Sequence, residues 1–386
     1  MRRKPLYRKI ADDMRAAVTA GRYVDGKLPS DTQLERRYET TRQTVLKAMQ
    51  SLERDGLILR RPGAGSFIVP RMDLPQGQYV STLIAPGDEF FERVSGYVAA
   101  ACRAYGLNLV WGPDADFRSM PPRASVDHLI EQYRRQNVRG VFFAPSAGDE
   151  ETAERNAEVA LALAAAGIRI ILLCRDNADF PRRSGFDLVG IDNLAAGHAQ
   201  TTHLIERGCR RIVYVMRDDL IWTMRGRLAG YRLALQEAGL EELPVQSASV
   251  NAWDERSLGN LMRKLKPDGF VCFNDALAAR VLNALAAIGV AVPARAKVIG
   301  VDDSEYARYL AVPLSTLRQP LASIGEEAAR LMALRLGNDT HPPRQILFDT
   351  ELVKRASSAV AEDKPKKISK SNGKAKRKDG KHGVTS

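Results

Sequence analysis

The chain has 386 residues, 45% of them hydrophobic, and a formal net charge of +12 at pH 7. This length allows two or three domains. The sequence has no N-terminal hydrophobic segment and no long uncharged apolar run. It therefore predicts neither export nor a membrane span, and a cytoplasmic protein is expected.

The positive charge is concentrated at the two ends of the chain. Residues 1–70 carry +7 and residues 363–386 carry +7, whereas the part between them carries −2. Basic ends on a near-neutral body suit a polyanion such as double-stranded DNA, and binding of this kind weakens as salt rises.

Residues 28–47 have the pattern of a helix-turn-helix. Ser30 and Gln33 form a capping box that begins one short helix. Residues 39–41 interrupt that helix, and Thr41 can cap a second helix with an apolar stripe. The polar side chains left on the outer face of this second helix are Arg42, Gln43, Thr44 and Lys47. Two ordinary surface helices with solvated charges would give the same local pattern.

The flanking segments favour DNA binding. Tyr7, Ile10, Met14 and Val18 predict an amphipathic first helix. Downstream, two strand-like runs enclose a glycine-rich turn at 62–65. Three helices followed by such a hairpin make a winged helix. The candidate DNA-contacting residues of the wing are Arg60 and Arg61, which supply charge, and Gly63 and Gly65, which let the backbone approach a phosphate or the minor groove.

Residues 5–69 resemble the GntR-type winged helix. The motifs that carry the resemblance lie at 5–7, 21–22, 28–30, 41–45, 52–56 and 63–65. The resemblance implies that Arg42 and Thr44 reach base edges or phosphates, and that Thr41 and Lys47 contact the DNA backbone. Thr32 stands where members of the family often carry an arginine that touches DNA.

After a short linker at 71–78, strand-like and helical stretches alternate. Strands are predicted at 79–85, 107–111, 140–144, 168–173, 186–191, 211–216, 269–273 and 297–301. Helices are predicted near 90–105, 125–137, 150–166, 194–207, 224–238, 254–265 and 275–288. This alternation predicts an α/β fold with parallel doubly wound sheets. Its length favours two subdomains with a ligand cleft at the carboxyl ends of the strands.

Polar residues follow several of these predicted strands. They are Asp192, Asn193, Asn274, Asp275, Asp302 and Asp303, joined by Arg227 and Trp253 near the starts of helices. Carboxylate, amide, guanidinium and indole groups together suit a polyhydroxylated ligand. Taken singly, Asp192, Asn274 and Asp302 could be helix N-caps, and Trp253 could be a core residue. Their convergence on one edge of the fold favours a ligand site.

Residues 79–358 resemble the LacI/GalR-type effector domain. The resemblance is carried by segments at 192–197, 203–212, 227–231, 273–278, 299–303 and 313–320. It implies a periplasmic-binding-protein-like clamp whose chain crosses between subdomains near 190, 314 and 342. The implied effector ligands are Phe90, Arg227, Trp253, Asn274 and Asp302. Cys174 stands where an aspartate often binds a sugar hydroxyl.

The remaining features carry less information about function. The four cysteines lie far apart in apolar stretches, so buried reduced thiols are expected and no metal site is indicated. The basic segment at 359–386 is predicted to be disordered. No nucleophile elbow, phosphate-binding glycine loop or catalytic histidine pair occurs, so neither an enzyme nor a cofactor is expected.

The sequence therefore predicts a homodimeric, ligand-responsive transcription regulator. A repressor of sugar-utilisation genes is expected, with a DNA operator and a sugar or sugar derivative as its partners. Two alternatives stay open at this point. One is a constitutive or architectural DNA-binding protein with a vestigial clamp, and the other is a regulator with a purine-like effector.

Overall fold

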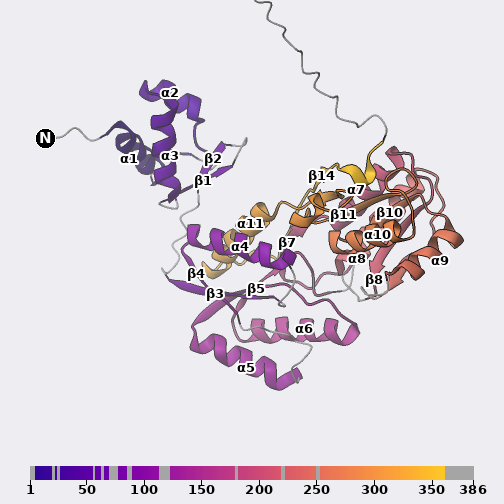
Figure 1. Cartoon of the computed structure of the whole chain (residues 1–386). Coiled ribbons are helices and arrows are strands. Elements are labelled where there is room, and N and C mark those ends of the chain that lie inside the picture. The colour runs from indigo at the N-terminus through magenta and orange to yellow at the C-terminus, as the bar shows by residue number, and fades with distance from the viewer. Residues whose placement is uncertain are drawn as a thin grey trace, which may run out of the picture.

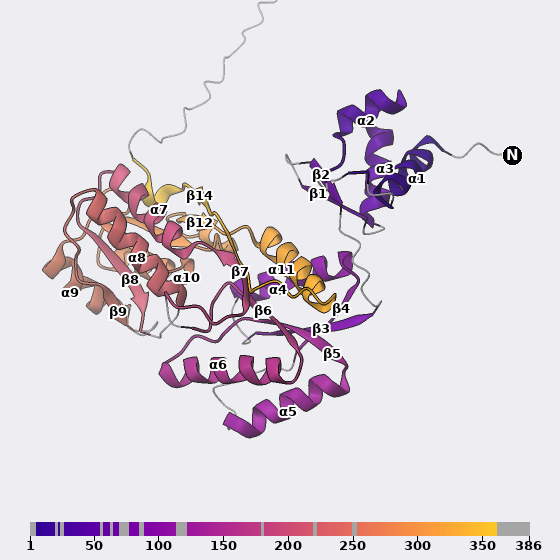
Figure 2. The same ribbon diagram turned by 180° about the vertical axis from the view of Figure 1, so that it is seen from behind.

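The chain folds as a small N-terminal domain followed by two α/β subdomains, as the computed structural model shows (Figures 1 and 2). The N-terminal domain lies apart from the two subdomains in both views. The structure describes residues 5–19, 22–23, 27–54, 57–61, 65–68, 77–84, 89–112, 122–178, 181–218, 222–248 and 253–360.

The N-terminal domain is the expected winged helix. Its elements are α1 (Leu6–Thr19), α2 (Asp31–Tyr38), α3 (Arg42–Arg54), β1 (Ile58–Arg61) and β2 (Gly65–Ile68). The two strands pair in antiparallel fashion. Ile10, Met14, Leu34, Met49 and Leu52 are almost fully buried and bring the three helices around one core. The apolar spacing of α1 and α3 thus becomes the interior of the domain.

The first α/β subdomain is built on a parallel sheet with strand order β13-β7-β6-β5-β3-β4. Its strands are β3 (Gln78–Leu83), β4 (Leu107–Val110), β5 (Val138–Phe143), β6 (Arg169–Leu173), β7 (Asp187–Ile191) and β13 (Gln345–Phe348). Its helices are α4 (Glu89–Ala104), α5 (Pro122–Arg135), α6 (Glu150–Ala165) and α11 (Leu321–Leu336). Helices α4 and α11 cover one face of the sheet, and α5 and α6 cover the other (Figure 1).

The second subdomain has the strand order β14-β12-β11-β10-β8-β9, parallel except for β14. Its strands are β8 (Ile212–Arg217), β9 (Gln246–Ala248), β10 (Gly269–Cys272), β11 (Lys297–Val301), β12 (Ser315–Arg318) and β14 (Glu351–Val353). Its helices are α7 (Asn193–Glu206), α8 (Trp222–Glu237), α9 (Glu255–Leu265) and α10 (Asp275–Ala287), with short 3-10 turns at Glu305–Arg308 and Ala356–Ser358. Helices α7 and α8 pack on one face, and α9 and α10 pack on the other.

The doubly wound fold predicted from the sequence is confirmed, with additions at its carboxyl-terminal end. The sequence predicted no strand at β9, β12, β13 or β14 and no helix at α11. These four strands have only three or four residues each. Such short strands are pinned by their pairing with neighbouring strands, so hydrophobic periodicity alone does not reveal them.

The chain passes between the two subdomains three times. The first passage lies between β7 and α7, close to the predicted position near 190. The second lies between β12 and α11, and the third between β13 and β14. The predicted positions near 314 and 342 are therefore several residues too early. The reason is that β12 and β13 each extend one subdomain's sheet before the chain leaves it.

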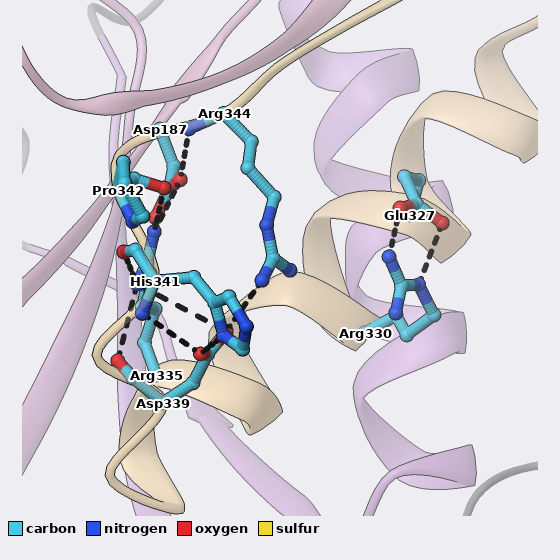
Figure 3. A network of polar contacts seen from close by, with 8 residues as sticks. All are labelled: Asp187, Glu327, Arg330, Arg335, Asp339, His341, Pro342 and Arg344. Atoms are coloured by element: carbon cyan, nitrogen blue, oxygen red, sulfur yellow. Dashed lines mark hydrogen bonds and ion pairs between the residues drawn. The ribbon is translucent and has the colours of Figure 1, made fainter.

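A polar network fixes α11 against the first sheet (Figure 3). The Arg335 guanidinium donates to both carboxylate oxygens of Asp187, with Nε–Oδ2 at 2.6 Å and Nη2–Oδ1 at 2.8 Å. The same carboxylate accepts from the backbone N–H of Arg344 at 2.7 Å. Asp339 accepts from Arg344 and from His341, whose hydrogen bonds hold the pKa of Asp339 down at about 2. The network joins the end of α11 to the segment that leads into β13.

Within the described part of the chain, no helix is both long and apolar enough to cross a lipid bilayer. The four cysteines are buried and none of them forms a disulfide bond, as expected. Burial raises the pKa of the Cys102 and Cys209 thiols to about 12, so these side chains pack as small apolar groups. The predicted tail and most of the predicted linker lie outside the described residues.

Candidate functional site

The recognition-helix side chains are presented as the sequence predicted. Ser30 Oγ accepts from Gln33 N at 3.3 Å, and Gln33 Oε1 accepts from Ser30 N at 2.8 Å, which completes the capping box of α2. Glu39 then takes a left-handed conformation with φ 46°, which ends the helix. The exposed residues at and after the start of α3 are Thr41, Arg42, Gln43 and Lys47, while Thr44 is half-buried and its hydroxyl lies 3.1 Å from that of Thr41.

The wing is more strongly tied to the helices than the sequence suggested. Arg60 Nη2 donates to Asp31 Oδ2 at 2.6 Å, an ion pair between β1 and the first turn of α2. This ion pair also positions the wing against α2, and the DNA contact predicted for Arg60 stays a prediction. Gly65 has φ +112°, a conformation that favours glycine.

Lys27 is a cation of this surface that the sequence analysis did not identify. It pairs with Phe67 through a backbone bridge, its Nζ lies 5.6 Å from the Phe67 ring centroid, and the residue is exposed. Its position before the capping box carries no helical or strand signal of its own. Of the predicted wing residues, Gly63 and the side chain of Arg61 lie outside the described residues.

The second candidate site is a cavity between the two α/β subdomains, at the carboxyl ends of their strands. The cavity and the open solvent at its mouth together span about 410 Å³. Its lining residues come from both subdomains: Phe90, Phe91, Cys174, Arg175, Ile191, Asn193, Thr223, Arg227, Phe273, Asn274, Asp302 and Gln319. This is the expected position of a ligand site in open parallel sheets, because the strand order leaves a crevice there.

Arg227 is the most buried cation of the cavity, with 4% of its surface exposed. Its Nε donates to Asn193 Oδ1 at 3.0 Å, and its Nη1 donates to the Phe273 carbonyl at 2.5 Å. Its guanidinium carbon also lies 4.7 Å from the centroid of the Phe273 ring. Burial lowers the pKa of Arg227, and the nearby Asp302 carboxylate opposes that shift. The side chain is therefore held in one orientation at a cost in solvation.

Asp302 and Asn274 line the cavity from the second subdomain. Asp302 Oδ1 accepts from Gln319 Nε2 at 2.8 Å. Asn274 Oδ1 accepts from Leu277 N at 3.0 Å, so Asn274 caps α10 and lines the cavity at once. The sequence left open whether Asn274 is a helix N-cap or a residue of the ligand site, and its position allows both roles.

The first subdomain contributes aromatic rings and a second guanidinium. Phe90 and Phe91 meet edge to face, with centroids 5.1 Å apart. The Arg175 guanidinium carbon lies 4.5 Å from the centroid of the Phe91 ring, and its Nη1 donates to the Pro145 carbonyl at 3.0 Å. Cys174, directly before it, has φ +61°. This unusual backbone turns the chain at the end of β6 and brings Arg175 to the cavity.

Four of the five predicted effector residues, Phe90, Arg227, Asn274 and Asp302, line this cavity. Trp253 does not. It is 8% exposed and belongs to the core of the second subdomain, so core packing, the alternative for this residue, describes it better. The indole ring is large enough to fill the space beside α9, and burying it there is favourable.

The other polar residues at the strand ends have structural partners. Asp192 caps α7 by accepting from Ala195 N at 3.0 Å. Burial raises the pKa of Asp303, but hydrogen bonds from Arg355 and Arg318 outweigh it and lower the pKa overall. These two carboxylates organise the edge of the fold and do not line the cavity.

Asp275 is a fully buried carboxyl beneath the cavity. It accepts from Thr316 Oγ1 at 2.6 Å and from Ser304 N at 2.9 Å. Burial raises its pKa well above the ordinary value, and the neighbouring Asp302 carboxylate raises it further. The side chain lies so close to Gly300 that a Cβ there would come within 2.2 Å of its Oδ1.

Several lining residues were missed from the sequence. Phe91, Arg175, Thr223, Phe273 and Gln319 were not predicted as ligands. For Arg175 a signal existed, because it follows the apolar run of β6 by two residues in the same way that the predicted polar residues follow their strands. Gln319 follows β12, a strand that the sequence did not predict, so no comparable signal was available.

Two family models match separate parts of the chain. Residues 6–68 match the gntR family of bacterial regulatory proteins, and residues 201–358 match the periplasmic binding protein-like domain. The chain thus joins a GntR-type DNA-binding domain to a periplasmic-binding-protein-like domain. This combination defines a DNA-binding transcription regulator.

Within that class, the chain is similar over most of its length to arabinose metabolism transcriptional repressors. It is 26% identical to the protein of that name from Halalkalibacterium halodurans, with 87% of this chain and 92% of the relative aligned. It is 24% identical to the one from Geobacillus stearothermophilus, with 92% and 98% aligned. A solved structure entitled transcriptional regulator CelR-cellobiose complex shares the fold, with a TM-score of 0.60, 21% identity, and 86% of this chain and all of that chain covered.

Proposed function

We propose that this protein is a cytoplasmic, effector-responsive repressor of sugar-utilisation genes, in which the cavity between the subdomains binds a small hydroxylated molecule. The observation that carries the proposal is the position of Arg227. It lies in a cavity lined by both subdomains and is oriented by Asn193 and the Phe273 carbonyl. A ligand bound there would contact both subdomains, so binding would favour their closed arrangement over an open one.

The lining suits a sugar-like molecule. Asn274, Asp302 and Gln319 offer amide and carboxylate groups to hydroxyls, and the phenylalanine rings offer apolar surface to a ring face. The relatives named for arabinose metabolism and the neighbour solved with cellobiose support a carbohydrate effector. On this proposal Phe90, Arg227, Asn274 and Asp302 are effector-binding residues.

We further propose that the protein acts as a homodimer in which each winged helix reads one half-site of a pseudo-palindromic operator. Large apolar side chains on the surface of the clamp support an interface, with Tyr97 44%, Trp111 63% and Tyr309 73% exposed in the single chain. DNA contacts would come from Thr41, Arg42, Gln43, Thr44 and Lys47, with Lys27 and the wing glycines at the groove edge. Sedimentation with and without a duplex selected from random DNA would test the stoichiometry.

The Arg227→Ala variant tests the effector response. Arg227 lies in the clamp and not in the winged helix, so the variant should fold and bind its selected DNA normally. A buried hydrogen bond to a charged group contributes about 1.5–3 kcal/mol, so the effector concentration that releases DNA should rise roughly tenfold to a hundredfold. Fluorescence anisotropy of the protein–DNA complex, titrated with individual pentoses, hexoses and cellobiose, measures this shift.

Arg139→Gln is the matched control, because Arg139 is an exposed arginine at the amino end of β5, opposite to the cavity. Release of DNA by Arg227→Ala at the wild-type effector concentration would remove Arg227 from the effector site. A thermal-shift panel that also contains adenine, guanine and their nucleosides separates a sugar effector from a purine-like one. A protein that no compound stabilises, and whose DNA no compound releases, would instead be a constitutive DNA-binding protein.

A further inference from the structure

We infer that the effector is an anion, a hydroxylated molecule that carries a carboxylate or a phosphate. This inference rests on the proposed effector function of the cavity and specifies its ligand class. The cavity brings together two guanidinium groups, Arg175 from the first subdomain and Arg227 from the second. Asp302 is the single carboxylate among the described residues that line it.

Arg227 provides the deeper guanidinium. Two of its five N–H donors are used by Asn193 and by the Phe273 carbonyl. Because the side chain is 4% exposed, it gains little solvation from water, and a charged ligand group that accepts from it would replace that solvation. Asp302, which already accepts from Gln319, compensates this charge from one side of the cavity.

Arg175 provides the second guanidinium from the opposite subdomain. The ring of Phe91 and the carbonyl of Pro145 hold its charged end at the cavity. The positive φ of Cys174 turns the backbone so that Arg175 reaches the cavity. The neighbouring strand β7 accommodates this turn because residue 190 is glycine, and a Cβ at that position would come within 3.0 Å of Cys174 Cα. A ligand anion between Arg175 and Arg227 would therefore contact a cation on each side of the cleft, and closing the cleft would strengthen both contacts.

The backbone around the cavity also carries partial positive charge. Four helices begin at it: Phe90 is the second residue of α4, Asn193 the first of α7, Thr223 the second of α8, and Asn274 the N-cap of α10. Helix N-termini carry partial positive charge and unsatisfied N–H groups, and both favour an anion. The fields of these helices add to those of the two guanidinium groups.

The amide and hydroxyl groups of the lining still require hydroxyls on the ligand, so a bare inorganic anion would leave them without partners. A sugar acid and a sugar phosphate share the required chemistry, which is an anionic group at one end of a polyhydroxylated body.

Compounds that share a carbon skeleton and differ in whether they carry an anionic group test this inference. Thermal-shift and calorimetric titrations of the full chain would compare glucose with gluconate and glucose 6-phosphate, and ribose with ribonate and ribose 5-phosphate. At least one anionic member should bind more tightly than its neutral parent by about tenfold or more, since each charge-assisted hydrogen bond is roughly twice as strong as a neutral one. The carboxylate and phosphate arms then identify which anionic group the site accepts.

The Arg175→Gln variant tests the role of the second guanidinium. It should weaken binding of the preferred anion by roughly tenfold and leave the affinity of the neutral parent nearly unchanged. Arg139→Gln, which removes the same charge far from the cavity, should change neither. The wild-type protein gives an independent readout, because anion affinity should fall as sodium chloride rises while the affinity of the neutral parent stays level.

Each outcome decides the question. If a neutral sugar binds as tightly as its anionic partners and releases DNA, the inference fails and the proposed repressor function stands. If the anions bind but Arg175→Gln binds them as well as the wild type does, Arg175 is not part of the site. If neither neutral nor anionic members bind, both the inference and the proposed sugar response are wrong.

Discussion

Individual side chains at the cavity are placed by partners far away in the sequence. Arg227 on α8 is oriented by Asn193, at the start of α7, and by the carbonyl of Phe273 after β10. A guanidinium bonded at two of its edges has little rotational freedom left, so its remaining donors are fixed before any ligand arrives. Arg42 is the contrasting case, because it is an exposed side chain at the start of α3.

Replacing Arg42 by alanine should reduce the ability of the protein to discriminate between DNA sequences. If the Arg42 guanidinium reads a guanine in the major groove, Arg42→Ala should lose about 1–3 kcal/mol of discrimination at one base pair of the selected duplex. Lys47→Ala should instead weaken binding to all duplexes alike and lower the salt slope by about one. Competition binding with single-base variants measures both, and a uniform loss for Arg42→Ala would assign it to a phosphate.

Asp275 provides a prediction about pH. The pKa of Asp275 is raised in the folded protein. At pH values between the ordinary aspartate pKa and this higher native pKa, the folded protein therefore keeps a proton on Asp275 that the unfolded chain has lost. This group's contribution to stability therefore falls as pH rises through that interval. Asp275→Asn keeps an oxygen for Ser304 N and removes the titration, so its stability relative to the wild type should increase as pH rises above the ordinary aspartate range.

Urea unfolding at several pH values measures that difference. Asp254→Asn is a control of opposite sign, because the hydrogen bond from Ser257 N lowers the pKa of Asp254. That variant should lose stability relative to the wild type only as pH rises through the range below the ordinary aspartate pKa, and the difference should stay level above that range. A difference for Asp275→Asn that stays constant with pH would show that Asp275 does not retain its proton in the folded protein.

At the scale of elements, the crossing of α7 and α8 sets the position of Arg227. The two helices approach so closely that a Cβ at Gly197 would lie 1.9 Å from the Arg227 carbonyl oxygen, and one at Gly230 would lie 2.0 Å from the Leu194 carbonyl oxygen. Glycine at these two positions lets the helix backbones touch. The effector cavity thus depends on two residues that do not line it.

Gly197→Ala should therefore be destabilising. The helices must separate to accept the methyl group, which costs on the order of 1–3 kcal/mol or more and displaces Arg227. Gly96→Ala on α4 is the matched control, since a Cβ there meets nothing within 4 Å. It should stabilise the protein by about 0.5–1 kcal/mol through helix propensity. Equal melting temperatures for the two variants would contradict the close crossing.

At the scale of the whole molecule, three chain passages connect two sheets whose cores are separate. The passages lie between β7 and α7, between β12 and α11, and between β13 and β14, and they are neighbours because β13 pairs with β7 and β14 pairs with β12. Each subdomain can therefore move as a unit when a ligand contacts both, with the φ/ψ changes taken up at these short connections.

The basic C-terminal segment supports a prediction about the complete chain. Residues 363–386 contain nine lysines and arginines against two acidic residues. Deleting them should weaken nonspecific DNA binding and flatten the slope of log affinity against log salt, with base preference unchanged. A control that replaces these residues by a shuffled sequence of the same composition should behave as the wild type. An unchanged slope after deletion would show that the segment does not contact DNA.

Local sequence patterns predicted the winged helix, the alternation of strands and helices up to β11 apart from β9, and four of the five effector residues expected at the cavity. These features depend on short-range patterns: the capping box at Ser30, the apolar stripe of α3, and polar residues that directly follow buried strands. Local spacing is sufficient for them because each element buries one face regardless of its partner.

Tertiary structure alone decided the rest. Trp253 lies in the core, Arg60 is paired with Asp31, and Arg175 lies at the cavity, and each outcome depends on a neighbour distant in sequence. The short strands β12, β13 and β14 form because other strands supply their hydrogen bonds. A side chain's role at such places is fixed by what packs against it, and the spacing of residues along one segment does not contain that information.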